Sequence, residues 1–164
     1  MKHWILCLAL ATTALTASLS ARAAEIEAAG CLITTPHGFV MGINRLINRL
    51  QLPIGGRLSG ETAEQTAERE TREETGLEVT VGETALKLKS GSVVFYHCTP
   101  LDPEPDYSRL KPTDRMEVSR ALVVNPDTLL SSTGEAVETR WRFPQMRWIL
   151  RALFLGLRQG ASAT

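Results

Sequence analysis

Residues 55–77 read GGRLSGETAEQTAERETREETGL, a segment that combines a glycine turn, a helix signal and a dense set of glutamates. Thr62 and Gln65 match a capping box, which predicts that a helix begins immediately after Thr62. Gly76 predicts where this helix ends, because glycine readily takes the left-handed conformation that follows a helix. The segment therefore predicts one complete helix between these two signals.

The acidic residues of this helix share one face. At about 3.6 residues per turn, Glu70, Glu73 and Glu74 lie together on the side that carries small alanines, and like charges at this spacing destabilise a helix. A hard divalent cation would offset the repulsion, because Mg²⁺ prefers oxygen ligands and bridges carboxylates to substrate phosphates. Opposite charges four residues apart favour the alternative, a solvated charged helix without a metal. The spacing alone leaves both interpretations open.

The whole segment resembles the Nudix box, G-x5-E-x7-R-E-U-x-E-E-x-G-U, in which U is a bulky apolar residue. Thr71 departs from this pattern, since it occupies an apolar position, and we expect it to pack through its methyl group. Ile54 and Leu58 replace residues usual in the preceding loop, which leaves the metal ligands intact but bears on loop geometry and substrate choice. The matching positions are Gly55, Glu61, Arg69, Glu70, Glu73, Glu74, Gly76 and Leu77.

This resemblance implies both a fold and a reaction. The implied fold is the Nudix α/β/α sandwich, an α/β fold with a mixed sheet between the box helix and a C-terminal helix. The implied reaction is hydrolysis of the diphosphate linkage of a nucleoside diphosphate derivative, with Mg²⁺, or Mn²⁺ in its place, as the cofactor. The resemblance also implies that Glu70, Glu73, Glu74 and the carbonyl of Gly55 bind the metal, while Arg69 orients a box glutamate.

Further candidate residues lie outside the helix. Glu117, ahead of the apolar run 121–124, resembles a downstream carboxylate of the family that acts as a metal ligand or general base. The alternative is that Glu117 is a surface acid beside basic neighbours. The family uses different glutamates as the general base, and the prediction here is Glu73 or Glu117. Arg57, before the helix, and Tyr107 and Arg109, in a proline-rich loop, are candidates for contact with a substrate base or phosphate.

The N-terminal residues differ in character from the rest of the chain. Residues 1–23 predict a secretory signal peptide, because a basic start precedes a short apolar run and a small-residue cleavage site. An uncleaved membrane anchor is the alternative. We expect export, to a bacterial periplasm, of a single Nudix domain formed by residues 24–164. Removing two basic residues and no acid turns the net charge of 0 into about −2, which argues against nucleic-acid binding.

Two cysteines, Cys31 and Cys98, remain after residue 23, each inside a strand-like run. An even pair in an oxidising compartment indicates a disulfide. The alternative is a pair of buried, small apolar side chains. The sequence leaves the choice between these two states open.

The remaining segments predict strands and a second helix. A hairpin is predicted over residues 28–44 with its turn at 36–38, and further strands at 77–81, 85–88 and 92–98. An apolar stripe at helical spacing predicts a C-terminal helix that packs on the sheet. Several arginines and two tryptophans in this tail favour the alternative, contact with an anionic membrane surface. The stripe consists of Met146, Ile149, Leu150, Leu153, Phe154 and Leu157.

Two other functions stay open at this point. One is an envelope enzyme that acts on lipid-linked diphosphates and uses the arginine-rich tail to sit at the membrane. The other is a catalytically silent Nudix-fold module that binds a diphosphate or a partner protein. The acidic cluster favours a hydrolase, because a silent module has no need to keep mutually repelling carboxylates.

Overall fold

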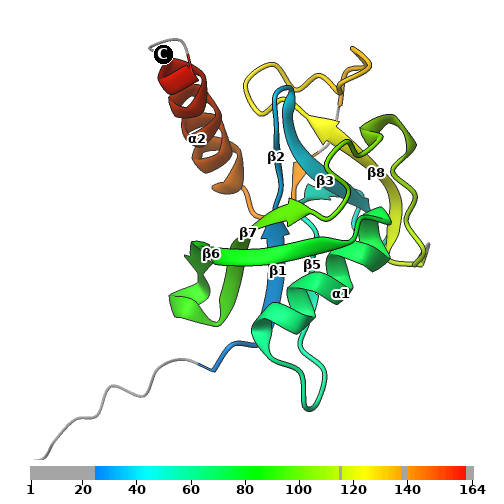
Figure 1. Ribbon diagram of the computed structural model, residues 1–164, viewed down its shortest axis with the longest axis vertical. Coiled ribbons are helices and arrows are strands. Elements are labelled where there is room, and N and C mark those ends of the chain that lie inside the picture. Colours follow the sequence, from blue (N-terminus) through cyan, green and yellow to red (C-terminus); the bar gives the residue numbers. More distant parts are fainter. Residues whose placement is uncertain (1–24, 115, 138–139, 162–164) are drawn as a thin grey trace, which may run out of the picture.

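The computed structural model describes residues 25–114, 116–137 and 140–161. The predicted signal peptide, residues 1–23, lies outside the described residues. Within the described ranges, no helix is long and apolar enough to cross a bilayer. Figure 1 shows the arrangement: strands occupy the middle of the molecule, and helices α1 (Ala63–Thr75) and α2 (Met146–Ala161) lie on different sides of them.

The strands form two mixed sheets. The first has the order β5-β1-β7-β6, and the second has the order β2-β3-β4-β9, with β8 also paired to β3. The pairs β1–β7 and β4–β9 are parallel and the other pairs are antiparallel. The predicted α/β class is therefore confirmed, although the strands divide into two sheets. Their bounds are β1 Ala28–Leu32, β2 Thr34–Thr35, β3 Gly38–Asn44, β4 Arg49–Gln51, β5 Ile54–Gly56, β6 Val79–Leu88, β7 Val93–Pro100, β8 Val118–Val124 and β9 Arg140–Trp141.

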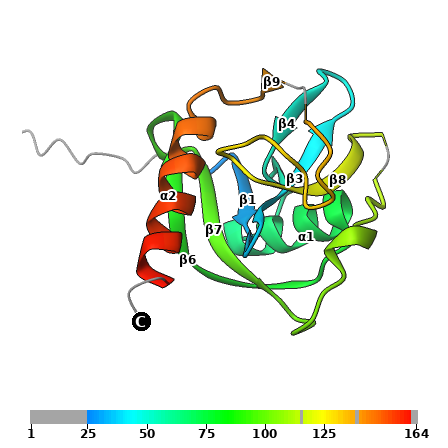
Figure 2. The same cartoon turned by 90° about the horizontal axis from the view of Figure 1, so that it is seen from above.

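Alternation along the strands builds a hydrophobic core on each side of the sheets. Successive strand residues point to opposite faces, and in β7 Phe95 belongs to the core under α2 whereas its neighbours Val94 and Tyr96 belong to the core under α1. On the α2 side, Phe154 packs edge-to-face on Phe39 of β3, with ring centroids 6.2 Å apart. Figure 2 shows β7 between the two helices, as the sandwich requires.

Helix α1 begins and ends where the sequence predicts. The backbone N–H of Gln65 donates to the Thr62 hydroxyl at 3.2 Å, and the Thr62 N–H donates to Oε1 of Gln65 at 2.9 Å. Gly76 follows the helix with φ 80°, and a Cβ there would lie 2.8 Å from the Lys111 carbonyl oxygen. Thr71 is fully buried and its hydroxyl has no hydrogen-bond partner, which fits a position that usually takes an apolar residue.

Two sequence-based predictions of secondary structure need correction. The predicted strands at 77–81 and 85–88 are one continuous strand, β6, because register shifts between Val81 and Leu86 absorb the polar interruption as β-bulges. In α2, the predicted apolar stripe is only half buried: Met146, Leu150 and Phe154 enter the core, whereas Leu153 and Leu157 are exposed. The hairpin of β2 and β3 with its turn at 36–37 is confirmed.

Cys31 and Cys98 form a disulfide, with their Cα atoms 5.5 Å apart. Cys31 lies on β1 and Cys98 on β7, and both side chains belong to the core under α1. The bond therefore joins the two parallel strands directly beneath the helix that carries the glutamates.

Candidate active site

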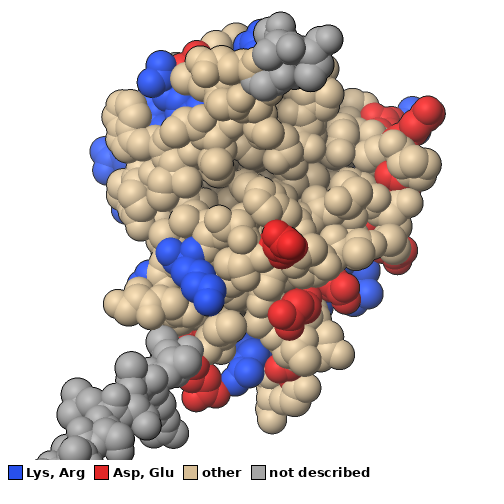
Figure 3. Space-filling view, turned by 60° about the vertical axis from the view of Figure 1, so that its left-hand side comes forward, with Lys and Arg blue, Asp and Glu red and all other residues tan. Residues whose placement is uncertain are grey.

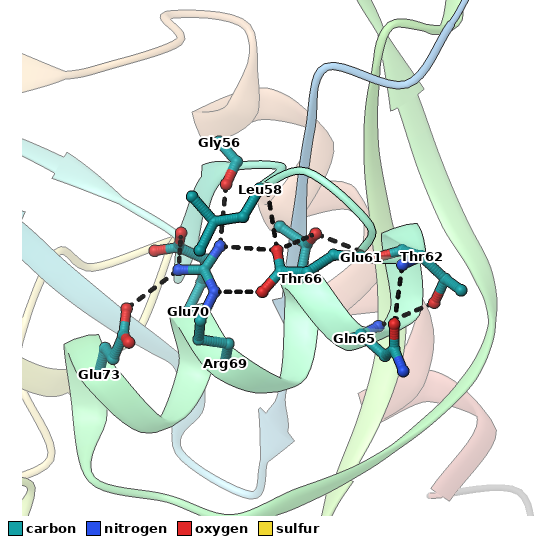
Figure 4. A network of polar contacts seen from close by, with 9 residues as sticks. All are labelled: Gly56, Leu58, Glu61, Thr62, Gln65, Thr66, Arg69, Glu70 and Glu73. Carbon is teal, nitrogen blue, oxygen red and sulfur yellow. Dashed lines mark hydrogen bonds and ion pairs between the residues drawn. The ribbon is translucent and has the colours of Figure 1, made fainter.

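Arg69 lies at the centre of a network of ion pairs, drawn in Figure 4. Its Nε donates to Oε1 of Glu61 at 2.7 Å, and its Nη1 donates both to Glu70 at 2.6 Å and to Glu73 at 3.0 Å. It also donates to the carbonyl oxygen of Gly56 at 2.9 Å. These bonds, with the one to Glu61 first, raise the pKa of Arg69 above its ordinary value. The predicted pairing of Arg69 with a box glutamate is thus present, and it extends to three glutamates.

Glu61 fixes the loop that precedes α1. Its carboxylate accepts from the Leu58 N–H at 3.0 Å and from the Thr66 hydroxyl at 2.9 Å, in addition to Arg69. The hydrogen bond from Arg69, followed by that from the Leu58 backbone, lowers the pKa of Glu61 to about 2. Glu61 thus remains ionised and fixes the position of the Arg69 guanidinium relative to the loop.

Three carboxylates converge beneath this network. Glu70, Glu74 and Glu117 each place a carboxylate oxygen within 4.8 Å of the others. Glu70 and Glu74 are 5% and 1% exposed, so two of the three acids are almost removed from water. Glu117 directly precedes β8, which pairs with β3 across the second sheet. The fold therefore brings an acid from far along the chain to the acidic face of α1.

Glu74 is held by contacts that sequence reasoning did not identify. Its Oε1 accepts from Nε2 of Gln51 at 2.8 Å, and its Oε2 accepts from the Ile54 N–H at 3.0 Å. Gln51 in turn accepts from Arg142 at 2.8 Å. The one available signal was a glutamine between Leu50 and Leu52 in an apolar run, since a buried polar side chain must find partners.

Burial makes the cluster electrostatically unfavourable without a cation. Burial, reinforced by the charges of Glu117 and Glu70, raises the pKa of Glu74 to about 9, against the lowering effects of the Ile54 N–H and Arg142. Burial likewise raises the pKa of Glu70, although its hydrogen bond with Arg69 opposes the shift. Buried acids that repel one another and present oxygens to a common point are the donor set that a divalent cation prefers. The residues therefore fit a bound divalent metal ion.

The raised pKa of Glu74 predicts how the stability of the metal-free protein depends on pH. The pKa rises from 4.5 to about 9 on folding, so between these values the folded state holds a proton that the unfolded chain has lost. This stabilising contribution is complete below pH 4.5 and is lost as the pH rises through about 9. We expect the free energy of unfolding to fall with rising pH in this window, by up to about 1.4 kcal/mol per pH unit.

Urea unfolding in the presence of a chelator, at several pH values across this window, measures the dependence. The Glu74→Gln variant is the control, because its amide does not titrate and its profile should be flatter. Excess Mg²⁺ should also reduce the slope, since metal binding requires the ionised carboxylate. Parallel profiles for the wild type and Glu74→Gln would contradict the assignment of the slope to Glu74.

Gly55 leaves no room for a side chain beside the carboxylate cluster. A Cβ built on Gly55 would lie 2.0 Å from Cδ of Glu70, so the glycine leaves the space that the carboxylate occupies. The predicted metal-ligating carbonyl of Gly55 thus belongs to a residue in direct contact with the cluster. We expect Gly55→Ala to displace Glu70 and to weaken metal affinity and activity by about 10–100-fold.

Gly56→Ala is the matched control for this prediction. A Cβ on Gly56 meets no atom within 4 Å, and alanine keeps the carbonyl that accepts from Arg69. Isothermal titration with Mg²⁺ and steady-state kinetics would compare the two variants. Equal effects of the two substitutions would show that the contact with Glu70 is unimportant.

The structure does not place every predicted site residue in the cluster. Glu73 pairs with Arg69 and its side chain is 36% exposed, so it lies at the edge of the acidic group. Arg57 pairs with Glu25 at 2.6 Å. Tyr107 packs against the core under α1, and exposed Arg109 pairs with Asp106 at 3.2 Å. The roles predicted for these residues in metal or substrate binding stay predictions.

A hollow of about 350 Å³ on α1 lies away from this chemistry. Glu68, Arg72 and Glu78 are among the residues that line it. Glu68 and Arg72 are on the opposite side of the helix from Glu70, because residues two apart are about 200° apart on a helix. The candidate active site is therefore the carboxylate cluster, with the partly exposed Glu73 at its edge.

The fold and the cluster define a class of protein: an α/β/α sandwich in which helix α1, on one side of the strands, presents buried carboxylates suited to a divalent metal. The comparison with protein families matches the NUDIX domain over residues 25–149. The chain therefore belongs to the Nudix family, and with the glutamates and the arginine of the box all present it is a Nudix-type pyrophosphohydrolase. The comparison with curated protein sequences finds no significant match.

Several solved structures share this fold. An ADP-ribose pyrophosphatase from Streptococcus suis has a TM-score of 0.58 and 17% identity, covering 80% of this chain and 90% of that one. A UDP-X diphosphatase has a TM-score of 0.56 and 16% identity, covering 88% and 68%. An Ap4A hydrolase from C. elegans has a TM-score of 0.54 and 20% identity, covering 81% and 99%. At these identities the likeness establishes the fold.

Proposed function

We propose that this protein hydrolyses the diphosphate linkage of a nucleoside diphosphate derivative by attack of water on phosphorus, with Mg²⁺ as the cofactor. The observation that carries the proposal is the convergence, within 4.8 Å, of the buried box residues Glu70 and Glu74 with Glu117 from the segment before β8. The solved structures with this fold include an ADP-ribose pyrophosphatase, a UDP-X diphosphatase and an Ap4A hydrolase, and all three compounds contain diphosphate linkages.

The described residues suggest how the site would hold its metal. Glu70, Glu74 and Glu117 supply carboxylate oxygens, and the Gly55 carbonyl is the candidate backbone ligand beside them. When bound, a divalent cation neutralises phosphate charge and lowers the pKa of coordinated water. Mn²⁺ would fit the same oxygen donors.

The other polar residues orient these groups. Arg69 bonds to Glu70 and Glu73 at once, so it sets the distance between a buried carboxylate and one at the solvent edge. Gln51 and the Ile54 N–H occupy both oxygens of Glu74 and fix its rotamer. Such pre-positioning lowers the reorganisation that the site undergoes during reaction.

A substrate panel tests the proposal. A form lacking residues 1–23, which retains every contact that the structure describes, is incubated with ADP-ribose, UDP-sugars and dinucleoside polyphosphates, with Mg²⁺, with Mn²⁺ or with a chelator. Metal-dependent release of nucleoside monophosphate or of other products of diphosphate cleavage is the expected result. Folded protein that binds Mg²⁺ but turns over none of these compounds would contradict the nucleoside diphosphate assignment.

The general base is assigned by comparing Glu73→Gln with Glu117→Gln. A base that does not bind the metal lowers kcat and removes the acidic limb of the pH–rate profile while Mg²⁺ affinity is unchanged. A metal ligand lowers Mg²⁺ affinity as well. Glu117 brings a carboxylate oxygen into the cluster with Glu70 and Glu74, whereas Glu73 pairs with Arg69 outside that group, so we expect Glu73→Gln to show the first pattern and Glu117→Gln the second. The reverse result would exchange the two roles.

Two alternative functions give different outcomes in the same assay. An enzyme for lipid-linked diphosphates would be inactive on soluble nucleotides but would cleave an isoprenyl diphosphate in a metal-dependent way. A silent binding module would cleave neither class. The buried, mutually repelling acids favour the hydrolase, since a module without chemistry gains nothing from the cost of burying them.

Export to a bacterial periplasm is also proposed, from the signal-peptide pattern of residues 1–23. The Cys31–Cys98 disulfide supports it, because such bonds persist in oxidising compartments. Fractionation of cells that express the full chain would test the location. Recovery of the uncleaved chain with the membrane fraction, stable to salt and alkaline washes, would favour the alternative of an N-terminal anchor.

A further inference from the structure

Helix α2 turns an apolar face toward solvent. Ordinary surface helices bury their apolar side and expose polar residues. In α2, Met146, Leu150 and Phe154 are buried in the core, but a second apolar side of the helix is exposed to solvent. This second side forms a shallow groove lined by Ile149, Ala152, Leu153, Gly156 and Leu157. Trp148 lies beside the groove with 63% of its surface exposed. We refer to these six residues as the α2 apolar face.

Arginines border this face. Arg147, Arg151 and Arg158 follow one another at helical spacing, and around the helix Trp148 lies between these arginines and the groove. Residues 146–161 contain no acidic residue. Arg151 pairs with Asp127 at 2.5 Å, and the guanidinium of Arg147 lies 5.6 Å from the centre of the Trp148 ring. Figure 3 looks on this side of the molecule: uncharged atoms fill the middle of the view, Lys and Arg lie mainly along the left, and Asp and Glu lie mainly to the right and below.

A basic pocket continues the border at the start of α2. This pocket of about 470 Å³ is lined by Arg49, Arg140 and Arg147 together with Trp141 and Trp148, among others, and no described carboxylate lines it. None of its three arginines forms an ion pair within the described part of the chain. The Nε1 of Trp141 and the Nε of Arg147 are buried without a hydrogen-bond partner. The pocket is therefore suited to an anion that accepts hydrogen bonds.

We propose that the α2 apolar face and this arginine pocket form a docking surface for an anionic lipid bilayer. The leucines and Trp148 enter the boundary between headgroups and acyl chains, and the arginines contact lipid phosphates. An amphipathic helix with basic residues beside its apolar face has the composition of helices that lie in this interface. Without residues 1–23 the chain carries a net charge of about −2, so the local basic surface, and not the overall charge, orients the protein on the membrane.

A second copy of the chain fits this surface less well. Because α2 contains no acidic residue and no described carboxylate lines the pocket, pairing of two copies through this face would bring their arginines together. Juxtaposed like charges disfavour such an interface. Charge complementarity therefore selects an anionic surface as the occupant. The inference concerns where the protein binds and is independent of the substrate proposed above.

Co-sedimentation with lipid vesicles tests the proposal, using the form that lacks residues 1–23 so that the apolar N-terminal run does not contribute. We expect binding to vesicles that contain phosphatidylglycerol and at least tenfold weaker binding to phosphatidylcholine alone. Tryptophan fluorescence gives a second readout, since Trp148 is exposed and Trp141 is already buried. A blue shift on vesicle addition that disappears in Trp148→Phe locates the contact at α2.

Two matched substitutions distinguish binding through the α2 apolar face from nonspecific binding through any exposed apolar residue. Leu157 on α2 and Leu101, outside it, are 54% and 60% exposed, so a glutamate at either position adds the same charge at similar exposure. We expect Leu157→Glu to weaken vesicle binding about tenfold or more and Leu101→Glu to leave it unchanged. Arg147→Gln should weaken it about fivefold.

Three results would overturn the proposal. The first is failure of the wild-type domain to bind phosphatidylglycerol vesicles at low ionic strength. The second is equal weakening by Leu157→Glu and Leu101→Glu. The third is a dimer in sedimentation velocity that Leu157→Glu converts to a monomer, because a second copy would then cover the α2 apolar face.

Discussion

Replacing Glu70 by glutamine is expected to lower kcat by about two to three orders of magnitude at saturating Mg²⁺. The substitution removes a charged oxygen from the buried cluster and breaks the 2.6 Å ion pair with Arg69. The electrostatic stabilisation that a correctly held cation provides is worth several kcal/mol, and each 1.36 kcal/mol corresponds to a factor of about ten in rate. Steady-state kinetics on whichever compound the substrate panel identifies would measure the effect.

Stability should respond to Glu70→Gln in a different way. Glu70 is buried beside Glu74 and Glu117, and burial raises its pKa, so removal of its charge also removes repulsion. We expect the melting temperature of the metal-free variant to be unchanged or higher while activity collapses, as occurs where stability and function conflict. A variant that is inactive only because it unfolds would contradict the catalytic interpretation.

Glu68→Gln is the matched control for this substitution. Glu68 is exposed on the opposite side of the same helix, so its replacement makes the same chemical change away from the cluster. We expect its kcat and Mg²⁺ affinity to equal those of the wild type. A comparable loss of activity in Glu68→Gln would show that the net charge of the helix, and not the cluster, controls the rate.

Reduction of the Cys31–Cys98 disulfide is expected to lower the free energy of unfolding by about 4 kcal/mol. The bond closes a loop with a sequence separation of 67 residues, and the chain-entropy model assigns that much to a loop of this length. Because such a loss is a large fraction of the stability of a typical domain, the reduced protein should unfold at markedly lower urea concentration. Urea titrations with and without a reducing agent would measure the difference.

The double variant Cys31→Ala/Cys98→Ala is the control for this second prediction. The form lacking residues 1–23 has no other cysteine, so the double variant should unfold at the same urea concentration with and without the reductant. Its stability should resemble that of the reduced wild type, apart from the small loss of buried sulfur. A reductant effect of the same size in the double variant would mean that the disulfide is not its source.

The sequence alone determined the box helix and the family. Helix bounds depend on local capping, and Thr62, Gln65 and Gly76 carry their signals within one segment, so both ends of α1 match the prediction. The family follows from the spacing of residues 55–77, which is also local. The α/β class was predictable because alternating and helical periodicities are properties of short windows.

The composition of the site depended on tertiary structure. Glu73 and Glu74 are neighbours about 100° apart on the helix, and only the position of the sheet decides that Glu74 is buried while Glu73 remains at the edge. Gln51, at the end of β4, and Glu117, in the turn before β8, reach the same cluster from segments far apart in sequence. Their approach depends on strand register, which a single sequence does not specify.

The same reason explains the disulfide and the C-terminal helix. The sequence shows two cysteines in strand-like runs, but the parallel pairing of β1 with β7 brings their Cα atoms to 5.5 Å. The periodicity of α2 marks its apolar residues without showing which of them meet a partner. The sheet covers one side of that helix and leaves Leu153 and Leu157 in solvent, because burial is decided by what packs against a residue and not by the residue itself.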